Sequence, residues 1–258
     1  MPLPRSTSNG CIQARERGLC IYQRLETDDR RLIMNCSHIE IPWPTRSVSV
    51  MRLPMHTKNL SETLIGEVVS FHGHWCPGLA IGIRAAEWAL TELGKAADEE
   101  IVAVVETDMC GVDAIQYLTG CTFGKGNLIH LDFGKSVFSF YRRRDGKSAR
   151  LAARNDVREE FRAVMDRLHQ KMQQKSLNEE EARLLKETRE KVSEKIMTCP
   201  IEQLFDIGET TRSVPRKARI MTSLPCDQCL EATMETRTRR FQGRTLCIPC
   251  FEEMETRL

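Results

Sequence analysis

Apolar residues recur with helical spacing in two neighbouring segments of this chain, and a loop rich in histidine joins them. The first segment follows Ser61, a residue type that commonly caps helices, and the second begins at Pro77, which suits the first turn of a helix. Continuous apolar runs over 101–105 and 137–141 are typical of buried strands. This order of elements predicts a core in which helices pack against a sheet.

Shorter signals complete the expected core. They predict a short helix over 111–118, strands over 127–133 and 148–153, and a hairpin turn at Asp145-Gly146. The fold class that we expect is α+β, with a mixed or antiparallel sheet flanked by helices.

The charged segment 155–198 carries two further amphipathic patterns that meet near Ser176. Asn155 is expected to cap the first helix, and the apolar stripe over 157–172 is typical of a buried face or of a dimer seam. We therefore expect a helical arm here and, where the stripe is a seam, a homodimer.

The tail of the chain carries the most specific pattern in the sequence. Two Cys-x-x-Cys pairs, Cys226 with Cys229 and Cys247 with Cys250, are separated by seventeen residues. Four thiolates satisfy one tetrahedral zinc ion completely, so this spacing predicts a structural zinc in a small treble-clef or ribbon-like module. The alternative, a pair of redox dithiols, would need a thioredoxin-like βαβ context that the sequence does not offer.

Four parts are expected along the chain. Residues 1–57 lack sustained periodicity and are expected to be a poorly ordered extension, whereas 58–205 form the core with its helical arm. Residues 206–222, with glycine, proline and several basic residues, are expected to be a linker, and 223–258 form the zinc module.

Composition narrows the classes of function. The net charge is +2, hydrophobic residues are 41% and charged residues 29%, which favours a globular protein. No apolar run approaches the ~20 residues of a membrane span and no signal peptide begins the chain, so we expect a cytoplasmic protein without a membrane partner. Eleven cysteines in a reducing compartment suggest ligands, nucleophiles or packing groups rather than disulfides. Acidic residues offset the arginines of the tail, so nucleic-acid binding is not expected.

The candidate chemistry lies between residues 72 and 125, at the ends of predicted elements. Its members are His72, His74, Cys76, Asp108, Cys110, Asp113, Cys121 and Lys125. Taken singly, each is better explained by packing, but a mixed set of imidazoles and thiols in two loops suits zinc or another transition metal with an open position. Cys76 directly precedes a predicted helix, whose free N–H groups should lower the pKa of the thiol and make it reactive.

The segment 119–127 resembles a phosphate-binding loop without matching it. Gly120 lies one residue too close to Lys125, and Gly126 occupies the place of the magnesium-binding Ser or Thr, so an NTPase is not predicted. Gly124 and Gly126 are instead expected to cradle an anion with backbone N–H groups while Lys125 supplies a positive charge.

Three sequence blocks, 71–78, 106–115 and 119–128, resemble the family named after the E subunit of formylmethanofuran dehydrogenase. Together with the tail, the resemblance covers most of residues 60–258. It implies an α+β core, a helical extension, a C-terminal zinc finger, a dimer, and a metal near the His-Gly-His-x-Cys-Pro loop. The ligands that it implies are His72, His74, Cys76, Cys110 and Cys121. Leu230 departs from the family, which often has glycine after the second tail cysteine.

Three functions follow as hypotheses. The first is a metal-binding accessory or small subunit in molybdenum or tungsten enzyme chemistry of one-carbon metabolism, with the subunits of a formylmethanofuran dehydrogenase-like oxidoreductase as partners. The second is a stand-alone enzyme in which Cys76 or metal-bound water attacks a small anionic substrate. Lys125 would then hold the anionic end, and Asp108 or Asp113 would move protons. The third is a zinc-finger regulatory protein.

Overall fold

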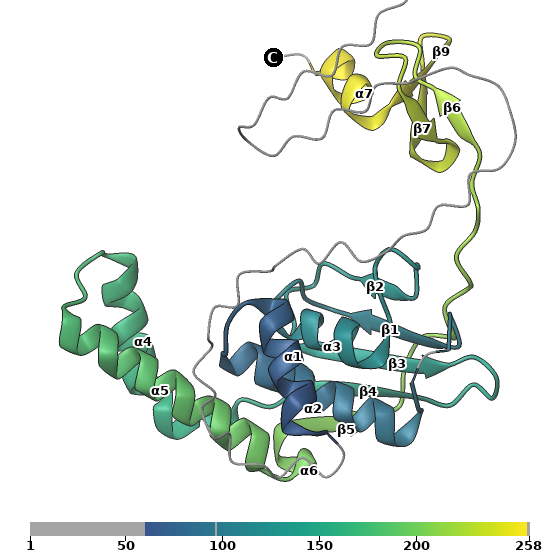
Figure 1. Cartoon of the computed structure of the whole chain (residues 1–258). Coiled ribbons are helices and arrows are strands. Elements are labelled where there is room, and N and C mark those ends of the chain that lie inside the picture. Colours follow the sequence, from purple (N-terminus) through teal and green to yellow (C-terminus); the bar gives the residue numbers. More distant parts are fainter. Residues whose placement is uncertain (1–59, 96, 257–258) are drawn as a thin grey trace, which may run out of the picture. The chain divides into compact units, whose positions relative to one another are not determined.

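The computed structural model describes residues 60–95 and 97–256. Three helices lie near the start of this part of the chain: α1 Glu62–His72, α2 Pro77–Glu92 and, after a first strand, α3 Gly111–Thr119 (Figure 1). Ser61 caps α1 by accepting a hydrogen bond from the Leu64 N–H at 3.2 Å, and Pro77 occupies the first position of α2, as predicted. The expected N-terminal extension, residues 1–57, lies outside the described residues.

Five strands form one mixed sheet in the order β2-β1-β3-β4-β5. Their bounds are β1 Ile101–Val105, β2 Leu128–His130, β3 Val137–Arg142, β4 Ser148–Ala153 and β5 Phe205–Gly208. The pair β1 and β2 is parallel because α3 crosses over between them, and the other neighbours are antiparallel. The predicted α+β class with a mixed sheet flanked by helices is confirmed.

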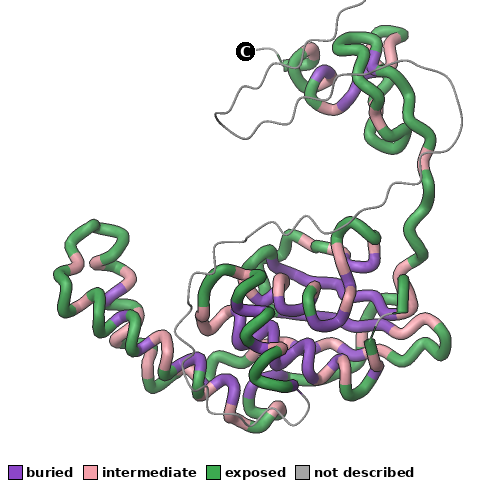
Figure 2. The backbone as a smooth tube through the Cα atoms, viewed as in Figure 1, coloured by how far each residue is buried: buried purple, intermediate pink, exposed green. Residues whose placement is uncertain are grey.

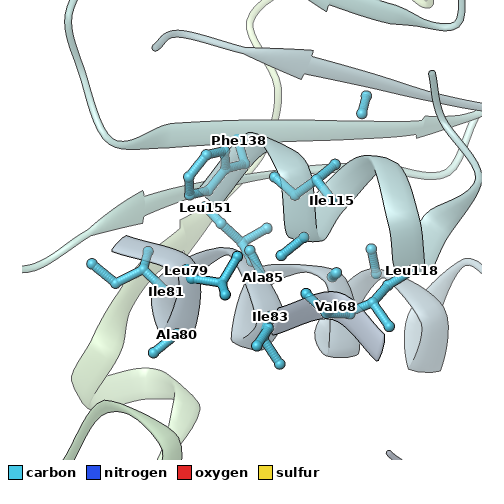
Figure 3. Close-up of a cluster of buried hydrophobic side chains, with 14 of the residues drawn as sticks. Val68, Leu79, Ala80, Ile81, Ile83, Ala85, Ile115, Leu118, Phe138 and Leu151 are labelled. Atoms are coloured by element: carbon cyan, nitrogen blue, oxygen red, sulfur yellow. The ribbon is translucent and has the colours of Figure 1, made fainter. Parts of the chain in front are cut away.

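The alternation of side chains along the strands divides the apolar core into two clusters. On one face of the sheet, Leu79 of α2 and Ile115 of α3 belong to the same buried cluster as Phe138 of β3 (Figure 3). On the other face, Val104 of β1 is buried together with Tyr141 of β3. Burial is densest in the central strands and in α2 (Figure 2). Both faces of the sheet therefore need a cover, and only one of them is covered by α1 to α3.

Two glycines let the backbones of α2 and α3 touch. A Cβ atom on Gly82 would lie 2.1 Å from the Gly111 carbonyl oxygen, and one on Gly111 would lie 3.0 Å from the Gly78 carbonyl oxygen. Only hydrogen fits at Gly82, because the atom in its way belongs to backbone and cannot turn aside. This contact falls within the first two turns of both helices, and it sets their N-termini, at Cys76 and Cys110, beside each other.

The helical arm consists of a 3-10 turn, Asp156–Arg158, followed by α4 Glu159–Gln173 and α5 Glu179–Thr198. The prediction that Asn155 caps the first helix is wrong, because its own backbone is already helical and its side chain makes no capping bond. Asn178 caps α5 in a capping box with Glu181. The apolar stripe is largely used within the chain, since Leu168 is fully buried and Phe161 packs on the core.

The expected linker is only partly a linker. Its first residues belong to β5, which pairs with β4 and follows the short helix α6 Ile201–Leu204. Beyond β5 the chain stays attached to the core, where the Thr210 and Ser148 hydroxyls lie 2.8 Å apart. No helix within residues 60–95 and 97–256 combines the length and the apolar character that crossing a membrane requires.

The tail is built from two small hairpins and one helix. Its elements are β6 Ser223–Pro225, β7 Ala232–Met234, a 3-10 turn Glu235–Arg237, β8 Thr238–Phe241, β9 Arg244–Cys247 and α7 Ile248–Glu255. Gln242 and Gly243 form the turn between β8 and β9, with φ values of 48° and 79° that match a type I′ hairpin. A first cysteine pair on a turn, a hairpin, and a second pair at a helix start form the order of a treble clef.

Candidate metal centres

His72 is oriented by a carboxylate of the neighbouring helix. Its Nδ1 atom, at the end of α1, lies 2.7 Å from Oδ2 of Asp113 in the first turn of α3. A carboxylate at Nδ1 fixes the proton on that nitrogen and leaves Nε2 as the lone-pair donor. The Nε2 atom is buried and has no hydrogen-bond partner among the described residues. A buried imidazole nitrogen without a partner, backed by a carboxylate, is the arrangement of a metal-ligating histidine.

Three more donor residues lie beside His72. One donor atom from each of His72, His74, Cys76 and Cys110 can be chosen so that all four lie within 4.8 Å of one another. His72 ends α1 and His74 lies in the loop that follows, whereas the N-termini of α2 and α3 supply the two thiols. Gly78 leaves room for them, since a Cβ there would stand 3.2 Å from Cys110 Cβ and 3.9 Å from Cys76 Sγ. The set of two thiols and two imidazoles fits a tetrahedral zinc ion in number, type and spacing.

Cys76 is not the low-pKa thiol that the sequence predicted. Its sulfur does accept a hydrogen bond from the Leu79 N–H at 3.4 Å, which by itself lowers the pKa. Burial is the larger influence, and together with the neighbouring Cys110 thiol it raises the pKa of Cys76 above its ordinary value. In the metal-free chain the helix terminus is therefore outweighed, and the thiolate form requires a bound cation.

His74 carries the cluster to the protein surface. His74 is exposed, whereas His72, Cys76 and Cys110 are partly buried. The centroids of the His74 and His72 rings lie 4.4 Å apart, with the rings tilted by 40°. Desolvation, followed by the charges of His72 and Arg189, lowers the pKa of His74. A neutral imidazole is the form that binds a metal. A small molecule or a partner protein approaching from solvent would meet this side of the site.

Cys121 does not join the four donors, although the sequence grouped it with them. It is fully buried at the other end of α3, where its sulfur donates to the Ile101 carbonyl oxygen at 3.4 Å. Desolvation raises the pKa of this thiol. Cys121 is thus a packing residue of the core, because the nine residues of α3 separate it from Cys110.

The glycine loop offers only part of the expected anion cradle. Two of its N–H groups are committed within the chain: Thr122 donates to Asn127 Oδ1 at 3.0 Å, and Gly126 donates to the Phe123 carbonyl oxygen at 3.0 Å. The Lys125 ammonium donates to the Asp98 carbonyl oxygen at 3.4 Å. Because α3 has nine residues, the loop at its end lies roughly 13 Å from the thiols at its start. Gly124, Lys125 and Gly126 therefore cannot hold a substrate against Cys76.

The two candidate proton carriers differ in their surroundings. Asp113 is engaged with His72, which makes it a positioning residue rather than a free base. Asp108 is exposed and forms no ion pair or hydrogen bond within the described residues. The sequence offered one signal for the positioning role, namely that Asp113 falls in the first turn of the helix that Cys110 begins.

The tail brings its four cysteines together as predicted. The sulfur atoms of Cys226, Cys229, Cys247 and Cys250 all lie within 4.8 Å of one another, and Cys229 and Cys247 are 3.9 Å apart. Hydrogen bonds from the N–H groups of Cys247 and Cys229 lower the pKa of Cys226 to about 6. The neighbouring thiols, Cys247 first, raise the pKa of Cys250 to about 12. Without a cation, four thiolates cannot coexist in so small a space.

Comparisons with known proteins agree with the sequence blocks. The family model described as "FmdE, Molybdenum formylmethanofuran dehydrogenase operon" matches residues 71–206. A curated relative from Archaeoglobus fulgidus, a "probable S-adenosyl-L-methionine-binding protein", is 33% identical over 188 residues, which are 70% of this chain and 50% of the relative. The chain thus spans about half the length of that relative. A solved structure, described as a "tungsten formylmethanofuran dehydrogenase subunit e (fmde)-like protein" from Syntrophus aciditrophicus, aligns with a TM-score of 0.49 and 24% identity, covering 76% of this chain and 94% of the other.

Proposed function

The chain belongs to the FmdE family, and from that premise we propose that it is a metal-binding protein with one metal ion in the core and one structural zinc in the tail. In the core, His72, His74, Cys76 and Cys110 hold zinc or another transition metal. The observation that carries this proposal is the buried Nε2 atom of His72, which has no partner in the described chain while Asp113 holds the opposite nitrogen.

Zinc is the metal that the donors favour. Two thiolates and two imidazoles suit a borderline-soft ion without geometric demands of its own, whereas magnesium or calcium would require oxygen ligands. The lowered pKa of His74, which favours the neutral imidazole, and the carboxylate behind His72 both support ligation. A bound metal of this kind supplies a positive charge and, where a ligand position opens, a Lewis acid.

We propose further that the protein is an accessory or small subunit in molybdenum or tungsten enzyme chemistry, as the family description suggests. The exposure of His74 supports this role, because a metal centre that reaches the surface can be contacted by a partner protein. The homodimer and the cytoplasmic location stay predictions. Two exposed apolar side chains of the helical arm support the prediction of a homodimer: Met172 and Leu184 expose 43% and 37% of their surface.

A stand-alone enzyme receives less support from the geometry. The metal and Cys76 would be in place, but Lys125, which was to hold the substrate's anionic end, belongs to the opposite end of α3. Asp113 is occupied by His72. A substrate would have to be held by groups other than those that the sequence suggested.

A pull-down from native cells tests the accessory role. The full chain and a Cys76→Ala, Cys110→Ala variant would each be tagged and purified, and the recovered proteins examined for molybdenum, tungsten and pterin. We expect the wild type to recover a pterin enzyme and the variant to recover less of it. Purified wild-type protein that is metal-loaded but recovers no molybdenum or tungsten protein would contradict the accessory role.

A further inference from the structure

Within the described residues, an extended segment covers the second face of the core sheet. Val102, Val104 and Tyr141 are buried on this face, and Val214 packs against them. Val214 lies in residues 209–218, which we call the strap and which formed part of the expected linker. An apolar sheet face needs such a cover, because leaving it in water would forfeit about 25 cal/mol for each Å² of apolar surface.

Defined contacts hold the strap on the sheet. The Arg143 guanidinium donates to the carbonyl oxygens of Pro215 and Arg216, the latter at 3.1 Å. The Ala218 N–H donates to Glu99 Oε2 at 3.2 Å. Arg143 thus fixes the backbone of the strap directly, so the strap is a docked part of the core.

The strap does not fill the space above the strands. A hollow of about 420 Å³ remains between them, which is the size of site that holds a small molecule. Its floor consists of Val104, Ile129, Leu131 and Tyr141, and its rim includes Arg212 and Ser213 of the strap. The floor is apolar, and the rim offers a guanidinium and a hydroxyl group.

Arg212, the cation of the rim, shares an aromatic neighbour with Lys135, which does not line the hollow. The guanidinium carbon of Arg212 lies 5.8 Å from the centre of the Phe133 ring, and Lys135 Nζ lies 6.0 Å from the same centre. Within residues 60–95 and 97–256, neither cation forms an ion pair. Arg154, by contrast, pairs with Asp156 at 2.7 Å.

We propose that the hollow beneath the strap binds a small molecule with an apolar body and one anionic group, a carboxylate or a phosphate. The apolar body would lie on the floor, and Arg212 would meet the anion at the rim with its planar pair of N–H donors. The site is separate from both metal centres, and the proposal stands or falls independently of them.

Displacement of a fluorescent probe tests this site on the full metal-loaded chain. The probe is 8-anilinonaphthalene-1-sulfonate, and its competitors are 2-naphthoate, 2-naphthyl phosphate and the uncharged 2-naphthol, which share one apolar body. At least one of the two anions should displace the probe at about tenfold lower concentration than 2-naphthol. The anion that displaces the probe at the lower concentration identifies the head group that the site prefers. Equal displacement by 2-naphthol and both anions would overturn the proposal.

Variants of the strap locate the binding. Arg212→Ala should weaken binding of the preferred anion about tenfold and leave binding of 2-naphthol unchanged. Arg219 is an exposed arginine that does not line the hollow, so Arg219→Ala should change the binding of neither compound. Ser213→Trp changes an exposed residue and should block the probe by filling the space. Thermal melting confirms that each variant is folded. Binding that survives both Arg212→Ala and Ser213→Trp would place the probe elsewhere and refute the site.

Discussion

The core cluster and the tail cluster each bring four donor groups within 4.8 Å, but different parts of the fold hold them there. In the core, His72 and Cys110 are far apart in sequence, and packed helices bring them together. In the tail, local turns place the cysteines, and the buried apolar cluster consists of Leu246 and three of the cysteines themselves. We therefore expect the core scaffold to fold before its proposed metal binds, and the tail to need its proposed metal in order to fold.

The largest effect is expected from breaking the tail site. Cys226→Ser should unfold the tail, because metal binding supplies folding free energy of about 10–16 kcal/mol in comparable zinc modules. Limited proteolysis should show cleavage within 223–256 and an intact core. Cys199→Ser, at a cysteine outside both clusters, should leave the tail resistant. A tail that stays protected under strong chelation would contradict the dependence on metal.

The next effect concerns the scaffold beneath the core site. Gly82→Ala should lower the free energy of unfolding by about 3 kcal/mol or more, because the new methyl group would meet the Gly111 backbone. The variant should also lose the core metal, since the starts of α2 and α3 would move apart. Denaturant titration and metal analysis measure both effects.

The same substitution in α1 provides the control. Gly66 lies on an exposed helix surface, and the new methyl group in Gly66→Ala would have no neighbouring atom within 4 Å. It should raise stability by about 0.5–1 kcal/mol and keep the metal. Similar behaviour of the two variants would refute the role of the α2–α3 contact.

A smaller effect is expected from the residue that orients His72. Asp113→Asn should keep the fold and weaken core metal binding about 10- to 100-fold, because the amide no longer fixes the imidazole as a carboxylate does. Competition with a chromophoric chelator measures the affinity. Asp108 is an exposed carboxylate nearby in sequence, and Asp108→Asn should bind the core metal with the affinity of the wild type. Equal affinities for both variants would remove Asp113 from the site.

The smallest effect sharpens the description of the tail. Leu230 has a φ of 65° in the turn after the first cysteine pair, where the family often has glycine. A left-handed conformation costs a residue with a side chain about 1–2 kcal/mol, and glycine avoids this cost. Glycine also loses more backbone entropy on folding, which offsets part of the gain. We therefore expect Leu230→Gly to stabilise the metal-loaded tail slightly. Leu224→Gly, in the strand β6, should destabilise it. The melting temperature of the metal-loaded tail measures both effects. A lower melting temperature in Leu230→Gly than in the wild type would show that strain at this turn is unimportant.

The sequence was informative where structure is local. Caps, strand runs and the doubled Cys-x-x-Cys pattern predicted the helices α1 and α2, the strands β1 and β3, and the tail cluster, because neighbours in sequence determine them. It was less informative where distant segments meet. Cys121 and Lys125 were grouped with Cys76 and Cys110 although α3 separates them, and the docking of the strap was not foreseen. The clearest missed signal is Gly78-x-x-x-Gly82, a spacing that allows two helices to approach closely.

The metal content of a tail-broken chain tests the central claim most directly. Cys226→Ser protein, loaded with zinc and freed of excess, would be analysed for metal beside the same protein that also carries Cys76→Ala and Cys110→Ala. We predict one metal ion per chain in the first protein and none in the second, with both cores folded by circular dichroism. A folded core in the Cys226→Ser protein that retains no metal would contradict a metal site at His72, His74, Cys76 and Cys110.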